Sequence, residues 1–390
     1  MQSRRAFLRT SALGLGAASL LTTATRGQSS TPATPDPSPT GPALVPLVDW
    51  HSHVITAGEL RLLAGRSTAP RVFKDPSGQD LFENLTTVSA VAGKPSPALP
   101  SDLDTRVKHL DANGVHQQLL TYTVALGYDA TLSPEELRPF FRTLNDDLAA
   151  ILQKYPGRFL GVAAVPTADP AWAAEELKRA HRDLGLIGVA LPLNVFSTVE
   201  GAKTQAPLFK TAQSLGSHVF VHRAPASPSI PGQPPLIIPT DLSQVRWSVI
   251  SNTHLTNGAL TLGVSDFLDP YPDVSVQVIM LGGFFPYLLD SVVAAGRLRG
   301  VADPLARLRR IYLEPGPYSS TSSEWVAYAA AKFGADRILF GTDYGVGGGT
   351  SADRLKPSIA ALDRTLTREQ QQLIYIDNTR ALLKAKGITV

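Results

Sequence analysis

The feature that most constrains the fold is a regular alternation of short apolar runs with longer amphipathic stretches, between residues 45 and 386. The apolar runs have the length of buried strands, and the amphipathic stretches have the length and periodicity of helices. Strands that alternate with helices predict a parallel sheet, and eight such units over roughly 340 residues predict a (β/α)8 TIM barrel with insertions. The expected strands are 45–50, 115–123, 159–165, 187–191, 218–222, 275–280, 311–313 and 337–340.

Helical patterns fill most of the sequence between these strands. Several have typical ends: Ser133-Pro134 begins one, Asp169-Pro170 begins another, and Gly185 ends the latter. The polar stretch 65–100 and the proline-rich stretch 224–240 are expected to be insertions. The expected helices include 104–113, 134–155, 170–184, 205–215, 284–299, 321–333 and 367–386.

The N-terminus has the features of a targeting segment rather than of a folded domain. Ser3-Arg4-Arg5-Ala6-Phe7-Leu8 resembles a twin-arginine export signal, and the apolar run from Ser11 to Leu21 is short for a membrane span. An uncleaved membrane anchor or an ordinary helix is the alternative. We expect residues 1–30 to be the signal peptide, 31–43 a Pro/Ser/Thr-rich linker and 44–390 the barrel. The expected partner is the twin-arginine translocase, and the expected location is periplasmic or secreted, reached in the folded state.

Charge and cysteine content exclude several classes of function. The net charge is +3, but residues 1–30 carry four arginines and no acid, which leaves −1 for residues 31–390. Without a run of Lys or Arg in that part, no nucleic-acid partner is expected. The chain has no cysteine, so disulfides, thiolate metal sites and a cysteine nucleophile are excluded.

Three histidines and one aspartate lie where the strands of such a barrel end. His51 and His53 follow the first strand, and residues i and i+2 of an extended chain point to the same side. His222 closes the fifth strand and Asp343 follows the eighth. Because a barrel carries its chemistry at the C-terminal ends of its strands, these four side chains predict a site for Zn²⁺ or another divalent ion.

Each of these residues also has an ordinary explanation. His-x-His pairs occur on many surfaces, a lone histidine after a strand is often only hydrogen-bonded, and an aspartate after Gly-Thr often caps a turn. The metal hypothesis therefore depends on the four occurring together at the ends of the first, fifth and eighth strands.

The motifs at the first and last strands resemble a known family. Val48-Asp49-Trp50-His51-Ser52-His53 and Gly341-Thr342-Asp343-Tyr344 look like the amidohydrolase-related group that contains aminocarboxymuconate semialdehyde decarboxylase and the salicylate-type decarboxylases. The resemblance covers most of residues 44–386. Further matching segments are 106–114, 159–166, 175–180, Gly282-Gly283 and Pro286-Tyr287.

The resemblance implies a ligand set and a reaction. His51, His53, His222 and Asp343 would bind one divalent metal, usually zinc, with manganese as the alternative, and the commonest reaction is nonoxidative decarboxylation. Asp343 would also carry the proton. One departure is clear: Met280 stands where the family has a catalytic histidine, and a thioether cannot shuttle protons. Relatives often form dimers, so the resemblance implies a homodimer without indicating an interface.

Three functions remain open at this point. The first is a metal-dependent carboxy-lyase acting on a small cyclic or unsaturated acid, with Arg223 binding the substrate carboxylate and Phe284 lining an apolar wall. Ordinary surface exposure for Arg223 and ordinary packing for Phe284 are the alternatives. The second is a metal-dependent hydrolase of a lactone, ester or amide with Asp343 as base. The third is a catalytically impaired binding protein, which the methionine at position 280 favours.

Overall fold

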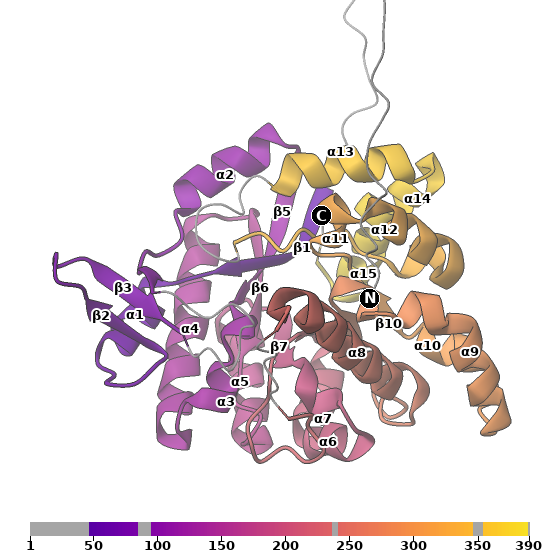
Figure 1. Ribbon diagram of the computed structural model, residues 1–390, viewed down its shortest axis with the longest axis horizontal. Helices are drawn as coiled ribbons and strands as arrows, with labels where there is room; N and C mark the ends of the chain where they lie inside the picture. Colours follow the sequence, from indigo (N-terminus) through magenta and orange to yellow (C-terminus); the bar gives the residue numbers. More distant parts are fainter. Residues whose placement is uncertain (1–46, 85–94, 236–240, 346–353, 389–390) are drawn as a thin grey trace, which may run out of the picture. The chain divides into compact units, whose positions relative to one another are not determined.

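The parallel barrel expected from the sequence is present. A computed structural model describes residues 47–84, 95–235, 241–345 and 354–388, and in it seven parallel strands form one sheet in the order β1-β5-β6-β7-β8-β9-β10 (Figure 1). The expected signal peptide, the linker and the start of the domain fall within residues 1–46, outside the described residues. The strands are β1 (Leu47–Val54), β5 (Val115–Tyr122), β6 (Phe159–Ala164), β7 (Gly188–Pro192), β8 (His218–His222), β9 (Ser275–Val278) and β10 (Ile311–Leu313).

The expected eighth strand is not a regular strand, which corrects the prediction for 337–340. Ile338 forms an isolated parallel bridge with Leu313 of β10, and Tyr344 forms one with Ser52 of β1. Backbone hydrogen bonds join this segment to both neighbours, from Leu339 N–H to Leu313 O and from Trp50 N–H to the carbonyl of residue 340. The segment therefore closes the barrel between its first and last strands, although it lacks a continuous ladder.

Helices surround the strands, as Figure 1 shows. Several of them lie outside the expected helical ranges, and the longest of these are α8 (Ser243–Val264) and α13 (Leu355–Thr365). The last expected helix, 367–386, is interrupted by a π-helical turn, Leu373–Asp377. The other α-helices are α1 (Ala57–Ala64), α2 (Leu103–Ala112), α3 (Tyr128–Thr131), α4 (Pro134–Lys154), α5 (Pro170–Asp183), α6 (Val199–Thr204), α7 (Ala206–Leu215), α9 (Phe285–Leu298), α10 (Pro304–Leu308), α11 (Tyr318–Thr321), α12 (Ser323–Ala329), α14 (Arg368–Gln372) and α15 (Asn378–Ala385).

The insertion expected over 65–100 contains a small antiparallel sheet of its own. β2 (Arg71–Lys74), β3 (Asp80–Glu83) and β4 (Ser96–Pro97) pair in that order, and the β2–β3 hairpin projects at the left of Figure 1. This sheet is separate from the barrel, so the insertion leaves the order of the barrel strands unchanged.

The barrel interior is mostly apolar but includes a buried polar group near the strand beginnings. Strands β5 to β8 are almost entirely buried, and β6 and β7 accordingly read as continuous apolar runs. His218 at the start of β8 bonds Ser275 through Nδ1 and Gln277 through Nε2, both at 3.0 Å, and Gln277 donates to the backbone carbonyl of Trp50. These bonds satisfy polar atoms that have no access to water.

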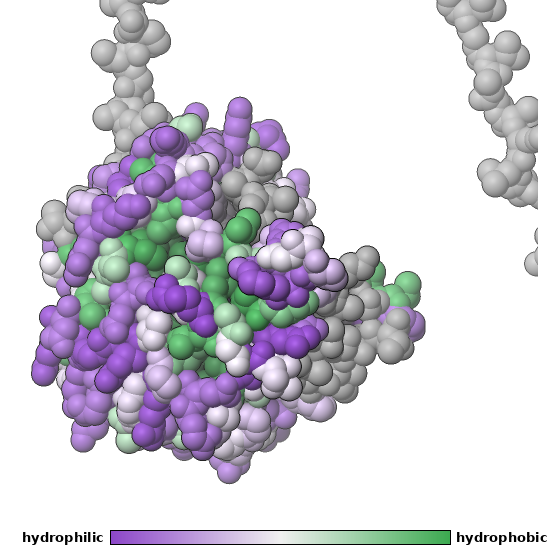
Figure 2. Space-filling view, turned by 90° about the vertical axis from the view of Figure 1, so that its left-hand side faces the viewer, coloured by the Kyte–Doolittle hydropathy of each residue, from purple (hydrophilic) through white to green (hydrophobic). Residues whose placement is uncertain are grey.

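Side-chain polarity varies over the surface of the barrel. On the face that Figure 2 shows, hydrophobic residues gather near the centre and hydrophilic residues lie around them. Among the helices of the described segments, none has both the length and the apolar character needed to cross a membrane.

Candidate metal centre

The first two candidate ligands lie inside β1 rather than after it, which corrects the expected strand end at residue 50. The pairing of β1 with β5 has an irregular register between Asp49 and Ser52, which locally distorts the strand. The side chains of His51 and His53 nevertheless converge, and their Nε2 atoms are 3.1 Å apart. Both histidines are almost fully buried, with exposed fractions of 1% and 0%.

The other two candidate ligands complete the group from β8 and from the closing segment. Oδ1 of Asp343 lies 3.3 Å from Nε2 of His51 and 3.2 Å from Nε2 of His53. The ring of His222 is centred 4.8 Å from that of His53. One ligand atom from each of the four residues lies within 4.8 Å of all the others. The structure therefore brings together every residue of the predicted ligand set.

Hydrogen bonds at Nδ1 orient two of the imidazoles. Nδ1 of His53 lies 3.2 Å from the carbonyl oxygen of Tyr122, and Nδ1 of His222 lies 3.1 Å from that of Arg223. A carbonyl oxygen only accepts, so each Nδ1 carries the proton and each Nε2 keeps a free lone pair. This arrangement is typical of histidines that bind a metal through Nε2.

His51 is oriented by a buried carboxylate that was not predicted from the sequence. Oε1 of Glu314, which follows β10, lies 2.7 Å from Nδ1 of His51. Glu314 also accepts hydrogen bonds from the backbone N–H groups of Gly316 and Met280. A Cβ atom at Gly341 would lie 2.0 Å from Oε2 of Glu314, so only glycine fits there. A carboxylate behind a metal-binding histidine raises the basicity of the ring and fixes its tautomer.

Asp49 connects the closing segment to β1 and β5 beneath the ligands. Its carboxylate accepts hydrogen bonds from the N–H and hydroxyl of Thr342, from the side chain of Gln118 and from the N–H of His51. The side chain of Gln118 in turn accepts a 2.8 Å hydrogen bond from Arg106, which also donates to the carbonyl of residue 53. This network holds the segments that carry the ligands at a fixed spacing.

The electrostatics of the site favour a bound cation. Burial lowers the pKa of His51, but the charges of Glu314 and Asp343 outweigh burial and raise this pKa to about 9. Burial raises the pKa of Asp343, but the charges of His51 and His53 hold it well below its usual range. Burial, followed by the charges of the neighbouring histidines, lowers the pKa of His222. The carboxylates of Asp343 and Glu314 thus favour a positive charge at this point, carried either by a proton on His51 or by a bound cation.

The residues present fit a divalent ion. Oδ1 of Asp343 is buried and has no hydrogen-bond partner among the described residues. It faces the Nε2 atoms of His51 and His53, which are the atoms through which these imidazoles would bind a metal. Ligands about 2.1 Å from a common ion lie roughly 3.0–3.5 Å from one another in ordinary coordination geometries. The separations of 3.1, 3.2 and 3.3 Å match that spacing. Three imidazoles and one carboxylate suit Zn²⁺, Mn²⁺ and related metals.

The remaining candidate residues lie around this centre. Arg223 is half-buried, donates to Ser251 Oγ at 3.2 Å and places its guanidinium 5.6 Å from the centre of the Trp247 ring. Burial lowers the pKa of Arg223, and the charge of Asp343 partly offsets this. Phe284 is half-buried before α9, and its N–H donates to Thr256 of α8. Its predicted role in an apolar wall stays a prediction.

Met280 occupies a turn directly after β9, next to the residue that orients His51. Both Met280 and Leu281 have left-handed backbone conformations, with φ of 50° and 55°. The N–H of Met280 lies 3.3 Å from Oε1 of Glu314, and the N–H of Leu281 donates to the backbone carbonyl of Glu314 at 2.8 Å. The turn is thus held by Glu314, and its side chain at 280 offers no proton donor.

Comparison with protein-family models gives the family. The amidohydrolase model matches residues 48–385, which include all four ligand positions and extend from β1 to α15. The chain belongs to the amidohydrolase family. The resemblance seen in the motifs of the first and last strands is thus confirmed at the level of the family.

Decarboxylases are among the relatives of this amidohydrolase. Gamma-resorcylate decarboxylase of Rhizobium sp. (strain MTP-10005) is 28% identical over 259 residues, which are 62% of this chain and 76% of that protein. The structure of 5-carboxyvanillate decarboxylase from Sphingomonas paucimobilis superposes with a TM-score of 0.67 at 17% identity, over 88% of this chain and 100% of the other. Dihydroxybenzoic acid decarboxylase from Polaromonas sp. JS666 was solved with manganese and the inhibitor 2-nitroresorcinol. It superposes with a TM-score of 0.60 at 19% identity, over 87% of this chain and 97% of the other. These superpositions confirm the barrel fold.

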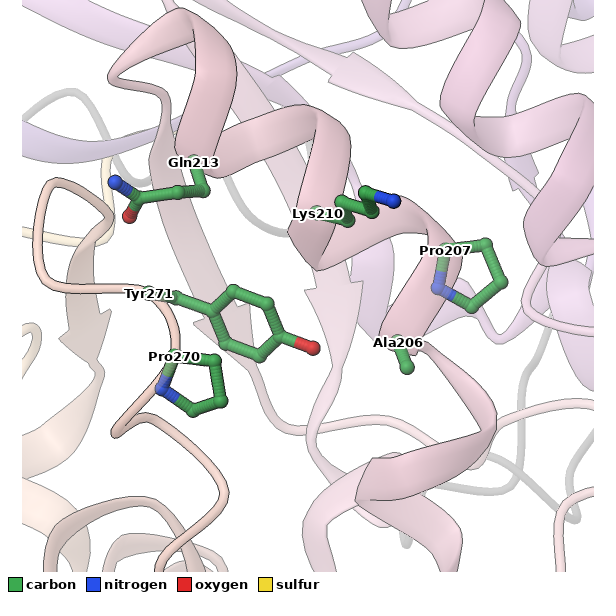
Figure 3. Close-up of a pocket in the computed structure, with 6 residues that line it drawn as sticks. All are labelled: Ala206, Pro207, Lys210, Gln213, Pro270 and Tyr271. Carbon is green, nitrogen blue, oxygen red and sulfur yellow. The ribbon is translucent and has the colours of Figure 1, made fainter.

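A surface hollow of this amidohydrolase involves none of the residues above. It has a volume of about 580 Å³ and lies between α7 and the loop before β9. Figure 3 shows Tyr271 extending across it toward α7. Its lining residues are Ala206, Pro207, Lys210, Gln213, Pro270 and Tyr271. With one lysine and otherwise uncharged residues, it offers no chemistry comparable to that of the ligand group.

Proposed function

We propose that this amidohydrolase is a metal-dependent decarboxylase of a small aromatic carboxylic acid. The observation that carries the proposal is the convergence of His51, His53, His222 and Asp343 at one point. The relatives named above as decarboxylases, which act on hydroxylated aromatic acids according to their names, support the choice of reaction. When bound, the divalent ion supplies Lewis acidity toward the substrate oxygens.

Arg223 is the residue that we assign to the substrate carboxylate. It directly follows the candidate ligand His222, and its bonding partner is a neutral serine hydroxyl rather than an acid. No carboxylate of a described residue lies within ion-pair distance of this half-buried guanidinium. A buried charge without a counter-ion is costly, so an acid substrate would supply the missing partner in a bidentate geometry.

Asp343 is the residue that we assign to proton transfer. In decarboxylation the bond between the ring carbon and the carboxylate breaks, the electron pair stays on the ring carbon, and CO₂ leaves. The ring carbon then takes up a proton, which Asp343 would deliver after receiving it from a substrate hydroxyl. The Met280 side chain cannot share this role, since a thioether has no transferable proton.

Zinc is the metal that we propose first, with manganese as the alternative that the Polaromonas sp. JS666 structure supports.

Elemental analysis of the purified mature protein tests the metal, and CO₂ release from a panel of hydroxybenzoates and unsaturated acids tests the reaction. One divalent ion per chain and CO₂ release from at least one acid are expected. Hydrolysis of lactones or esters without CO₂ release would overturn the decarboxylase assignment.

A matched pair of variants separates the site from the rest of the protein. In His51→Ala one ligand is removed, and we expect the stoichiometric metal and the activity to be lost while the barrel stays folded. His116→Ala removes an exposed histidine of β5 and should behave as the wild type in both measurements. Full metal occupancy in His51→Ala would contradict the ligand assignment.

A further inference from the structure

Asp343 receives a second contact from outside the ligand group. Nη1 of Arg354 lies 3.1 Å from Oδ2 of Asp343. Arg354 directly precedes α13, so it belongs to the connection that follows the closing segment. The Asp343 side chain is 16% exposed and that of Arg354 35% exposed, so this ion pair is partly shielded from water.

The two oxygens of Asp343 have different surroundings. Oδ1 faces the Nε2 atoms of His51 and His53 and has no hydrogen-bond partner among the described residues, whereas Oδ2 binds the guanidinium of Arg354. The backbone of Asp343 adopts a left-handed conformation with φ of 60°, which is uncommon for a residue other than glycine. Both the backbone and the ion pair therefore contribute to aiming one oxygen at the histidines.

A carboxylate left to itself would not keep this orientation. Rotation about the Cβ–Cγ bond of aspartate is soft, and a carboxylate binds metals through one oxygen or through both. A charge-assisted hydrogen bond to one oxygen restricts that rotation and competes with a metal ion for that oxygen. Arginine suits this task because it stays charged at any working pH.

We propose that Arg354 is a positioning residue of the metal centre, which holds Oδ2 of Asp343 so that Oδ1 alone is presented to the ion. The proposal rests on the proposed metal site and deepens it.

Cobalt-loaded protein tests the proposal without depending on turnover, because the visible absorption of Co²⁺ reports its coordination. Arg354→Met keeps the aliphatic stem and removes the charge, and we expect it to weaken metal binding roughly 10- to 100-fold and to change the Co²⁺ spectrum. Arg354→Lys restores a cation and should recover most of both. Arg246→Met removes an exposed arginine that pairs with Asp241 and should match the wild type.

Thermal melting of the metal-free proteins checks that the variants fold. If Arg354→Met does not fold, Arg354→Gln takes its place in the same measurements. An unchanged Co²⁺ spectrum and unchanged metal affinity in Arg354→Met would overturn the positioning role, whatever the activity. If the spectrum and affinity change as expected but no acid is decarboxylated by the wild type, the decarboxylase proposal fails and the role of Arg354 stands.

Discussion

Glu314 shows how much of a metal site lies behind its ligands. It is fully buried, and it contacts His51 and the turn that contains Met280 at the same time. A sequence signal exists, since Glu314 directly follows the apolar strand Ile311-Tyr312-Leu313, where a barrel places its functional residues. The sequence does not show that Glu314 contacts His51, so its position after a strand does not distinguish it from an ordinary loop residue.

Glu314→Gln tests this role. Glutamine keeps an acceptor for the Nδ1–H of His51 but removes the negative charge, so the ring becomes a weaker ligand. We expect metal affinity to fall about 10- to 100-fold with the fold retained, as measured by competition with a chelator. Glu175→Gln, which alters an exposed carboxylate of α5, should leave the affinity unchanged. Equal affinities in both variants would show that Glu314 is only structural.

Met280 is a second residue whose replacement is informative. Histidine tolerates the left-handed backbone found at this position better than most residues do, so Met280→His should fold. If a missing proton donor limits the chemistry, the variant should release CO₂ faster from salicylate-like acids, by up to about 10²-fold. An unchanged rate across the panel would show that the site uses another route for the proton.

The sequence predicted the four candidate ligands because each follows or ends an apolar run, and strand ends meet at one end of a barrel. It could not predict Arg354 as a partner of Asp343. That contact joins two residues of irregular segments, and the hydrophobic periodicity of the sequence predicts helices and strands but not contacts of this kind. The roles predicted for Arg223 and Phe284 also depend on a substrate pose, and they stay predictions.

Among the secondary-structure elements, the seven regular strands and the position of the eighth segment were predicted from the sequence, but the irregular form of the eighth was not. Continuous apolar runs identify strands that are buried on both sides. The closing segment is interrupted at Asp343, where the backbone turns left-handed to direct the carboxylate inward. At Gly345 φ is 93°, and a Cβ atom there would lie 2.3 Å from the carbonyl oxygen of His53. Left-handed residues at both positions are incompatible with a regular strand.

Helix α8 was missed for a related reason. It carries apolar residues on its exposed side as well as on its buried side: Val245 and Val249 are 65% and 54% exposed. A helix that is apolar on several sides lacks the periodic contrast from which helices are recognised. Its length of 22 residues became evident only in the structure.

The buried side chain of His218, at the beginning of β8, predicts that the stability of the folded protein depends on pH. Burial, followed by the charge of Lys386, lowers the pKa of His218 to about 3, whereas an unfolded histidine has a pKa of about 6.5. Between these values the unfolded chain binds the proton and the folded chain does not. Stability is therefore lost as the pH falls below about 6.5, by up to about 1.4 kcal/mol per pH unit for this group.

His218→Gln removes this proton uptake while keeping hydrogen-bonding groups near Ser275 and Gln277. We expect the variant to lose less stability than the wild type between pH 7.5 and pH 5, measured by urea unfolding of the metal-free proteins. Other titrating groups are common to both proteins, so they cancel in the comparison. A His116→Gln control should follow the wild type. Parallel curves for His218→Gln and the wild type would contradict the burial argument.

For the molecule as a whole, the proposal that remains is export in the folded state. Residues 1–30 contain the paired Arg4-Arg5 and the apolar run expected of a twin-arginine signal. Expressed at full length in a bacterium with this pathway, the protein should appear outside the cytoplasm with its N-terminus removed. Arg4→Lys combined with Arg5→Lys should retain it inside, whereas Arg9→Lys should not. Export of the double variant would exclude this route.

The closure of the barrel also sets the order in which the metal centre is completed. Asp49 and Thr342, hydrogen-bonded to each other, are 293 positions apart in the chain. A polypeptide still emerging from the ribosome therefore has His51 and His53 long before Asp343, the carboxylate of the candidate ligand set. The complete set of four ligand positions therefore exists only when synthesis of the barrel is nearly finished, and the site as described here can form only after that point.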